Sequence, residues 1–149
     1  TPAALATILV GWSATELTSQ PEPGEWSAVE VLCHLRDVEQ EVNLVRLEKV
    51  MESENPFIDC QDTDRWALDR QYILQDCLDA LGAFQQTRIE LLARLEALSE
   101  EDWQRPVRHA IFGPTRLVEL INIIAGHDRL HVRQVTKALQ AVPSQFFRS

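Results

Sequence analysis

Two histidines four residues apart, His127 and His131, are the residues of this chain best placed to do chemistry together. Four residues along an α-helix correspond to one turn and about 40° of rotation, so the two imidazoles lie side by side. They interrupt a stripe of apolar residues that follows one helical face: Leu117, Leu120, Ile121, Ile124, Val135, Ala138 and Leu139. Ionisable groups at core positions need partners or a task. The pair has the spacing of two metal ligands.

His34 is a third candidate, from a distant part of the chain. It lies about 40° from Val38 on a helical wheel, so it borders or enters the buried stripe of its own helix. In a bundle, facing stripes would bring it to His127 and His131. Three neutral imidazoles would leave coordination positions open for water or substrate, as in catalytic rather than structural zinc sites.

Simpler interpretations stay open for the histidines. An HxxxH pair on a helix is common, and a lone histidine on an apolar face is more often a satisfied core residue than a ligand. His109 lies in an extended stretch ahead of the helix that carries His127 and His131. A structural or surface role is favoured for it over a place at the rim of a cavity.

Several charged residues near the histidines also allow two interpretations. Asp128 makes the segment HDRLH similar to the HExxH box of metalloproteases, but Asp replaces the Glu that serves as general base. We interpret Asp128 as a support for the histidines or an ion-pair partner. Glu30 and Asp37 lie four and three residues from His34, and each either orients that imidazole or is a solvated carboxylate. Arg88 either pairs with a buried carboxylate or binds an acidic substrate.

Apolar periodicity predicts four helices that would carry these side chains, at about residues 2–17, 27–53, 68–98 and 117–139. Ser27 and Glu30 form a capping box at the start of the second helix, and Asn55-Pro56 stops it. Pro143 closes the fourth. The second helix is expected to bury Leu32, Leu35, Val38, Val42, Val45 and Met51, and the third to present Leu78, Leu81, Phe84, Arg88, Leu91, Leu92 and Leu95.

The connections are predicted to be mostly irregular. Residues 57–69 are polar, with a short helical turn around Trp66, and a second capping box begins a short turn that ends near Trp103. Residues 105–114 are predicted to be extended, with Val107, His109 and Ile111 on one side. Four amphipathic helices favour an all-α four-helix bundle with short extra helical turns in the loops.

Composition limits the classes of function. The 149 residues, 45% hydrophobic and 25% charged, fit one soluble globular domain spanning residues 1–149. No apolar run is long enough to span a membrane. A net charge of −9, from 23 acidic and 14 basic residues, weighs against nucleic acid and anionic membranes as partners. Cys33, Cys60 and Cys77 are odd in number and lack CxxC spacing, so we expect reduced thiols in a cytoplasmic protein.

The pattern as a whole resembles the DinB-like superfamily, which includes YfiT-like hydrolases and thiol-dependent S-transferases. The likeness covers residues 12–140 and is carried by these motifs: Trp26-Ser27, Glu30-Val31-Leu32, His34-Leu35, Asp37, Gly113-Pro114 and the run HDRLHVRQ at 127–134. The resemblance implies an up-down-down-up bundle, frequent dimers, and a divalent metal ion bound by His34, His127 and His131. We expect zinc or nickel there, with iron or manganese as alternatives.

Two classes of function follow. In the first, the protein is a metal-dependent enzyme that activates water or a small thiol against a small-molecule substrate, as a hydrolase or an S-transferase. In the second, it is a non-catalytic, dimeric helical bundle whose metal site is structural or vestigial. An open pocket at the histidines favours the first, and a closed site favours the second.

Overall fold

The computed structural model describes residues 1–142 and has a helical architecture with one small sheet. Pro143, expected to close the last helix, lies outside the described residues. The elements are α1 (Pro2–Ile8), α2 (Ala14–Leu17), α3 (Ala28–Val38), the π-helical segment η1 (Glu39–Asn43), α4 (Leu44–Glu52), β1 (Phe57–Ile58), α5 (Trp66–Asp69), the 3₁₀ turn η2 (Tyr72–Leu74), α6 (Cys77–Glu96), α7 (Glu100–Trp103), β2 (Pro106–His109), β3 (Gly113–Arg116) and α8 (Leu117–Ala141).

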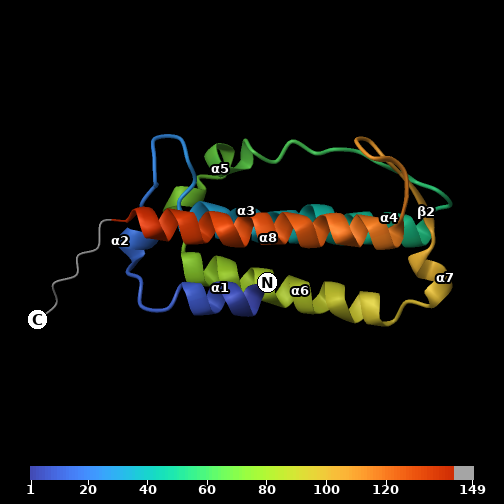
Figure 1. Cartoon of the computed structure of the whole chain (residues 1–149), viewed down its shortest axis with the longest axis horizontal. Helices are drawn as coiled ribbons and strands as arrows, with labels where there is room; N and C mark the ends of the chain where they lie inside the picture. Colours follow the sequence, from blue (N-terminus) through green and yellow to red (C-terminus); the bar gives the residue numbers. More distant parts are fainter. Residues whose placement is uncertain (143–149) are drawn as a thin grey trace, which may run out of the picture.

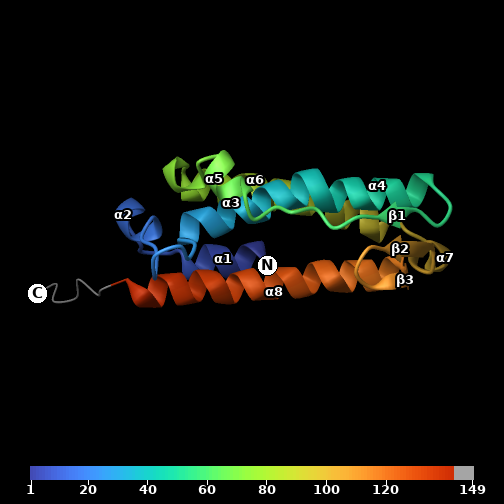
Figure 2. The ribbon, with the colours of Figure 1, turned by 90° about the horizontal axis from the view of Figure 1, so that it is seen from above.

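Four helical rods form the bundle: α1, the continuous run from α3 through η1 to α4, α6, and α8 (Figures 1 and 2). The run through α3 and α4 points the same way as α6, whereas α1 and α8 point the opposite way (Figure 1). The chain order is therefore up-down-down-up. This confirms the predicted all-α four-helix bundle, and it places α3 against α8, the two helices that carry the candidate histidines.

The first predicted helix is divided in two. The helix α1 ends at Ile8, and Gly11 adopts a positive φ of 86° that an L-residue would reach only with strain. A capping box between Ser13 and Glu16 then starts α2. The prediction of one helix over residues 2–17 was wrong because apolar spacing continued across this turn.

The second predicted helix is helical throughout residues 28–52, but its middle is a π-helix. The wider turn of η1 shifts the side chains that follow it around the helix axis. Val38 and Val42 are buried as expected, whereas Val45 is 51% exposed and its neighbour Leu44 is buried instead. The expectation that Val45 belongs to the core was therefore wrong.

The third predicted helix starts later than expected. Gln71 has a positive φ of 50°, and the Asp76 side chain accepts hydrogen bonds from the backbone N–H groups of Leu78 and Asp79. An N-cap of this kind fixes the start of α6 at Cys77 rather than at residue 68. Leu78 and Leu92, placed on the core stripe by the sequence pattern, are exposed instead.

The extended stretch becomes a hairpin. The strands β2 and β3 pair antiparallel, and β1 adds to β2 in parallel register, with Ile58 opposite His109. Val107 and His109 lie on one side of β2, as predicted, and are buried, but Ile111 lies in the turn and is 65% exposed. The predicted short turns around Trp66 and Trp103 are present as α5 and α7.

The core consists of two hydrophobic clusters at opposite ends of the bundle. One is centred on α1, α3, α6 and the last turns of α8, and the other on α4, the end of α6, the sheet and the start of α8. Buried polar residues occupy the zone between them: His34, Glu39, Asn43, Asp128 and His131. Among residues 1–142, no helix combines the length and apolar character needed to cross a bilayer.

Candidate metal centre

The middle of α3 and the middle of α8 bring three histidines together. The capping box at Ser27 fixes the start of α3: the Ser27 N–H donates to Glu30 at 2.8 Å. His34 lies two turns further on. Its Nε2 atom is 3.3 Å from Nε2 of His127, which is in turn 3.0 Å from Nε2 of His131. We call His34, His127 and His131 the histidine cluster.

The spacing of the three ring nitrogens fits a shared ligand. Two nitrogens bound to one ion by bonds of about 2.1 Å lie roughly 3.0–3.4 Å apart for the angles of octahedral and tetrahedral coordination. The two observed separations, 3.0 and 3.3 Å, fall within this range. All three candidate ligand atoms lie within 4.8 Å of one another. The donor set, three imidazole nitrogens, is one that zinc, nickel and iron accept.

The environment keeps these imidazoles neutral, as ligands must be. Burial, with a smaller contribution from the neighbouring histidines, lowers the pKa of His34 to about 3 and that of His127 to about 4. Burial also lowers the pKa of His131, although its bond to Gln134 opposes the shift. The cluster therefore presents neutral rings with lone pairs at neutral pH.

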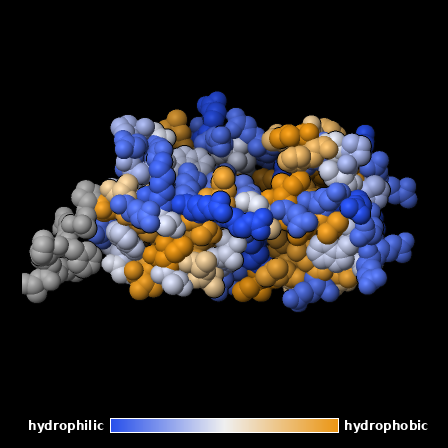
Figure 3. Space-filling model, viewed as in Figure 1, coloured by the Kyte–Doolittle hydropathy of each residue, from blue (hydrophilic) through white to orange (hydrophobic). Residues whose placement is uncertain are grey.

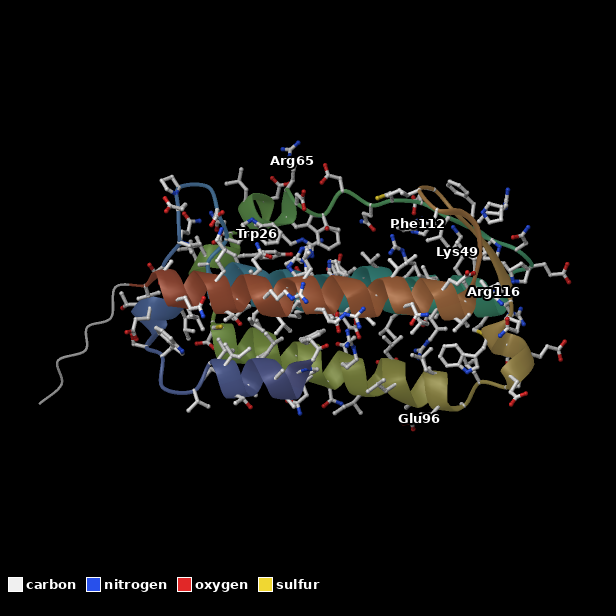
Figure 4. The ribbon with its side chains drawn as sticks, viewed as in Figure 1. Trp26, Lys49, Arg65, Glu96, Phe112 and Arg116 are labelled. Carbon is white, nitrogen blue, oxygen red and sulfur yellow. The ribbon has the colours of Figure 1, made fainter. Side chains whose placement is uncertain are left out.

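The Nδ1 atoms of His131 and His34 have different surroundings. His131 Nδ1 lies 2.7 Å from Oε1 of Gln134, so the Nδ1–H donates there and Nε2 keeps its lone pair. His34 Nδ1 is buried and has no hydrogen-bond partner within residues 1–142. The Trp26 ring packs beside both, with centroid distances of 4.9 Å to His34 and 6.3 Å to His131. Figure 4 shows Trp26 on the side of the α3–α8 layer that faces α5.

Glu30 and Asp37 do not orient His34. Glu30 closes the α3 capping box and accepts a bond from Gln20 at 3.1 Å. Asp37 accepts bonds from Arg36, Arg70 and Tyr72 at 2.6–2.7 Å, and so ties the segment of α5 and η2 onto α3. The alternative of solvated carboxylates is also wrong, because both residues are buried and fully engaged.

Asp128 faces away from the cluster into a buried network. Arg88 on α6 donates to Asp128 at 2.5 Å and to both carboxylate oxygens of Glu39 on η1. Asn43 donates to Glu39 at 2.8 Å, and the Thr1 hydroxyl donates to Asp128 at 2.6 Å. We call these five residues the Arg88 network. Of the two alternatives for Arg88, the structure supports the pairing with buried carboxylates, and Asp128 is an ion-pair partner.

A cavity of about 510 Å³ borders the histidine cluster at His131. His131 and Gln134 of α8 line it together with Trp26, Leu130 and Asp64, and Lys137 is ion-paired with Glu25 at its edge. A second cavity of about 460 Å³ shares Trp26 and Asp64 with the first. On the face of the molecule seen in Figure 3, apolar surface lies near the hairpin tip and along α1 and α6, with hydrophilic surface between.

The remaining sequence candidates lie outside the cluster. His109 is buried in the hairpin, where its Nδ1 accepts bonds from the backbone N–H groups of Ile111 and Phe112 at 3.2 and 3.4 Å. This is the structural role that the sequence favoured. The three cysteines are free, as expected. Burial raises the pKa of Cys33 to about 11 and that of Cys77 to about 12, so neither is a ready thiolate.

Several residues that contribute to the site were not identified from the sequence. Gln134 is three residues from His131 on one helix, a spacing that could have identified it as a hydrogen-bond partner. Glu39 and Asn43 follow the buried Leu35 at steps of four residues, so helical spacing places them on the buried side of the second helix. Their partners Arg88 and Asp128 come from other helices, which the local spacing does not identify.

Comparison with known proteins identifies the family of the chain. The family model of the DinB superfamily matches residues 1–135. YuaE of Bacillus subtilis is 25% identical over 146 residues, covering 90% of each chain. OB0782 of Oceanobacillus iheyensis, provisionally named a metal-dependent hydrolase, is 26% identical over 137 residues, covering 91% of this chain and 77% of that protein.

A solved structure supports the fold. YfiT from Bacillus subtilis, described as "a probable metal-dependent hydrolase with an unusual four-helix bundle topology", matches with a TM-score of 0.82 and 20% identity. The match covers 93% of this chain and 79% of YfiT. At that identity the likeness concerns the fold alone. With the family model matched over nearly the whole length, the chain belongs to the DinB superfamily.

Proposed function

We propose that this protein is a divalent-metal-dependent enzyme acting on a small molecule, with His34, His127 and His131 as the metal ligands. The observation that carries the proposal is the convergence of three neutral imidazoles beside an open cavity. A purely structural zinc site is usually closed by four protein ligands. Within residues 1–142, the cluster of side chains that could hold an ion offers three ligand atoms.

The chemistry would come from a Lewis acid at the cluster. A bound divalent ion lowers the pKa of a coordinated water or thiol toward neutrality and polarises an electrophilic substrate. The chain supplies the positioning. Gln134 holds the ring of His131, and the Arg88 network holds α8 against α6 and η1. The cavity beside Trp26 would bring a small molecule to the His131 side of the cluster.

Hydrolysis is the reaction that we favour. The names of OB0782 and YfiT, which refer to metal-dependent hydrolases, support it. The runner-up is transfer of a low-molecular-weight thiol, which rests on the resemblance of the histidine motifs. For the ion we propose zinc or nickel, because neutral imidazoles suit both metals.

Metal content is the first test. The full chain, exchanged into zinc and freed of excess metal, should carry about one zinc ion per molecule by elemental analysis. His127→Ala should lose the bound zinc, because two imidazoles from different helices hold an ion far more weakly than three. The matched control is His109→Ala, which removes the histidine outside the cluster and should keep the zinc. A wild-type protein that retains no zinc would contradict the proposal.

Activity is the second test. Zinc-loaded protein should hydrolyse at least one member of a panel of ester, amide and thioester substrates, or transfer a small thiol to an electrophile. A chelator should stop the turnover, and added metal should restore it. A metal-loaded protein that is inactive on both panels, with histidine variants that change only the melting temperature, would instead support the non-catalytic bundle.

A further inference from the structure

The cavity at the histidine cluster adjoins the second cavity at Trp26. The two cavities, of about 510 and 460 Å³, have three lining residues in common: Gly24, Trp26 and Asp64. The Trp26 ring also packs beside two of the proposed metal ligands, with centroid distances of 4.9 Å to His34 and 6.3 Å to His131. The second cavity therefore begins at a side chain that packs against the cluster itself.

The part of the second cavity beyond Trp26 is apolar. Trp26 lies on the side of the bundle that faces α5 (Figure 4), and α5 and η2 supply four apolar lining residues, which we call the apolar wall: Ala67, Leu68, Ile73 and Leu74. Leu68 is 79% exposed and Leu74 is 75% exposed. Single apolar side chains are common on protein surfaces, but several that line one concave site indicate a place for an apolar group.

The exposure of these leucines does not come from a loosely attached segment. Tyr72, between them in the sequence, is fully buried and donates to Asp37 on α3 at 2.7 Å. Arg70 donates to the same carboxylate at 2.7 Å, and its guanidinium lies 3.9 Å from the centre of the Trp66 ring. Because these contacts hold the apolar wall in place, binding a ligand there requires little ordering of the chain.

The charged residues of the second cavity disfavour an anionic ligand. Among the described residues that line it, the charged ones are Glu30 and Asp64, and no lysine or arginine accompanies them. Glu30 is engaged by the Ser27 N–H and by Gln20, so it is held as a carboxylate within the capping box. A carboxylate or phosphate on the ligand would meet like charge here without a compensating cation. The cavity therefore suits an uncharged apolar group.

We infer that the second cavity binds an uncharged apolar part of the substrate, an alkyl chain or an aromatic ring, while the reactive group lies at the histidine cluster. The inference rests on the proposed function and specifies its class of substrate: a small amphiphile such as an ester or amide of an apolar acid. The competing occupant of the apolar wall is a second copy of this chain. The lining residues shared with the cavity at His131 favour the substrate.

The first test titrates the metal-free full chain with two uncharged probes, propanamide and hexanamide, and follows the leucine methyl groups by ¹H–¹³C NMR. We expect saturable shifts of Leu68 and Leu74, and an affinity that rises about three- to fourfold for each added methylene. Hexanoate should bind more weakly than hexanamide. Leu74→Asn should weaken hexanamide binding about threefold or more. The matched control is Leu92→Asn, an exposed leucine of α6 outside both cavities, which should bind like the wild type.

The second test connects the second cavity to the metal centre. The zinc-loaded chain is titrated by calorimetry with acetohydroxamate and hexanohydroxamate, whose shared hydroxamate group binds zinc through its oxygens. The longer compound should bind more tightly to the wild type, because its chain reaches the apolar wall. Leu74→Asn should remove most of that difference and leave the affinity for acetohydroxamate unchanged.

The outcomes separate this inference from the proposed function. A wild type without bound zinc would contradict the proposed function, and the amide titration would still decide whether the second cavity binds apolar groups. Equal affinities for the two amides, for the two hydroxamates, or for hexanamide in the wild type and Leu74→Asn would overturn the inference. So would a dimer in analytical ultracentrifugation that Leu74→Asn converts to a monomer, with no hexanamide shift at Leu68 or Leu74, because a second copy would then occupy the apolar wall.

Discussion

His127 and Asp128 are adjacent on α8, yet they belong to two buried polar clusters of opposite character. Asp128 enters the Arg88 network, where each carboxylate accepts at least two hydrogen bonds from neighbouring side chains. His127 enters the histidine cluster, where three ring nitrogens face one another without a proton donor assigned between them. Both clusters lie between the two hydrophobic clusters of the core.

The difference separates a structural polar cluster from a candidate site. Buried polar groups normally have hydrogen-bond partners, and a network that is satisfied internally needs nothing from outside. The Arg88 network meets that condition. The histidine cluster does not, because its neutral nitrogens converge and His34 Nδ1 is without a partner within residues 1–142. Lone pairs left converging in this way are what a metal ion requires.

The largest predicted effect concerns the Arg88 network. Arg88→Met should lower the free energy of unfolding by about 3–5 kcal/mol, because Glu39 and Asp128 would be left as unpaired buried charges. Urea denaturation measures this. The matched control is Arg94→Met, which also removes an arginine with two carboxylate partners, but on the surface. An equal urea midpoint for the two variants would refute the structural role of the network.

The histidine cluster should respond to metal instead. Free zinc at about 100 times its dissociation constant should stabilise the wild type by about 2.7 kcal/mol. His34→Gln should gain almost no stability on addition of zinc. Without metal, its melting temperature should be close to that of the wild type. Thermal unfolding with and without zinc checks this. Zinc stabilisation that persists in His34→Gln would exclude His34 as a ligand.

Gln134 holds the ring of one proposed ligand, His131, through a hydrogen bond. Gln134→Leu removes the acceptor for the His131 Nδ1–H and should reduce zinc affinity about 10- to 100-fold while leaving one site per chain. Competition with a zinc chelator measures the affinity. Gln140→Leu is the control, since this exposed residue of the same helix lies outside the site. Similar affinities in both variants would show that Gln134 does not orient His131.

The smallest predicted effect is a dependence of the free energy of unfolding on pH in the metal-free protein. The pKa values of His34 and His127, about 3 and 4, lie below their ordinary value of 6.5. The unfolded chain therefore binds protons that the folded chain does not. The free energy of unfolding should fall as the pH drops from about 6.5 toward 4, by at most about 1.4 kcal/mol per pH unit for each histidine.

The pH dependence is measured by urea denaturation from pH 7 to 4. His127→Gln should show a shallower slope than the wild type, because one of the titrating groups is gone. Identical slopes in the two proteins would mean that the metal-free cluster does not exclude protons in the way its burial indicates.

Much of the fold followed from local sequence signals. The capping box at Ser27, the break at Asn55-Pro56 and the apolar stripe of α8 each appeared where predicted. These features depend on a few neighbouring residues. The errors arose where a non-local or unusual backbone feature intervened, as at Val45, which the π-helical turn moves to the surface.

The candidate site also combines features that follow from local sequence signals with features that depend on distant contacts. The convergence of His34, His127 and His131 was predictable, because helical spacing and facing stripes determine it. Their role as metal ligands remains a prediction. The partners of Arg88 and Asp37 were not predictable, since Glu39, Asp128 and Tyr72 come from three separate elements and Arg70 from the turn between α5 and η2.

X-ray absorption spectroscopy of the zinc-loaded protein tests the central claim most directly. The account predicts a first shell with three imidazole nitrogens at about 2.0–2.1 Å and at least one further light atom, which the His127→Ala protein would not reproduce. A first shell containing sulfur at about 2.3 Å, or one made only of oxygens, would place the metal elsewhere and contradict the account.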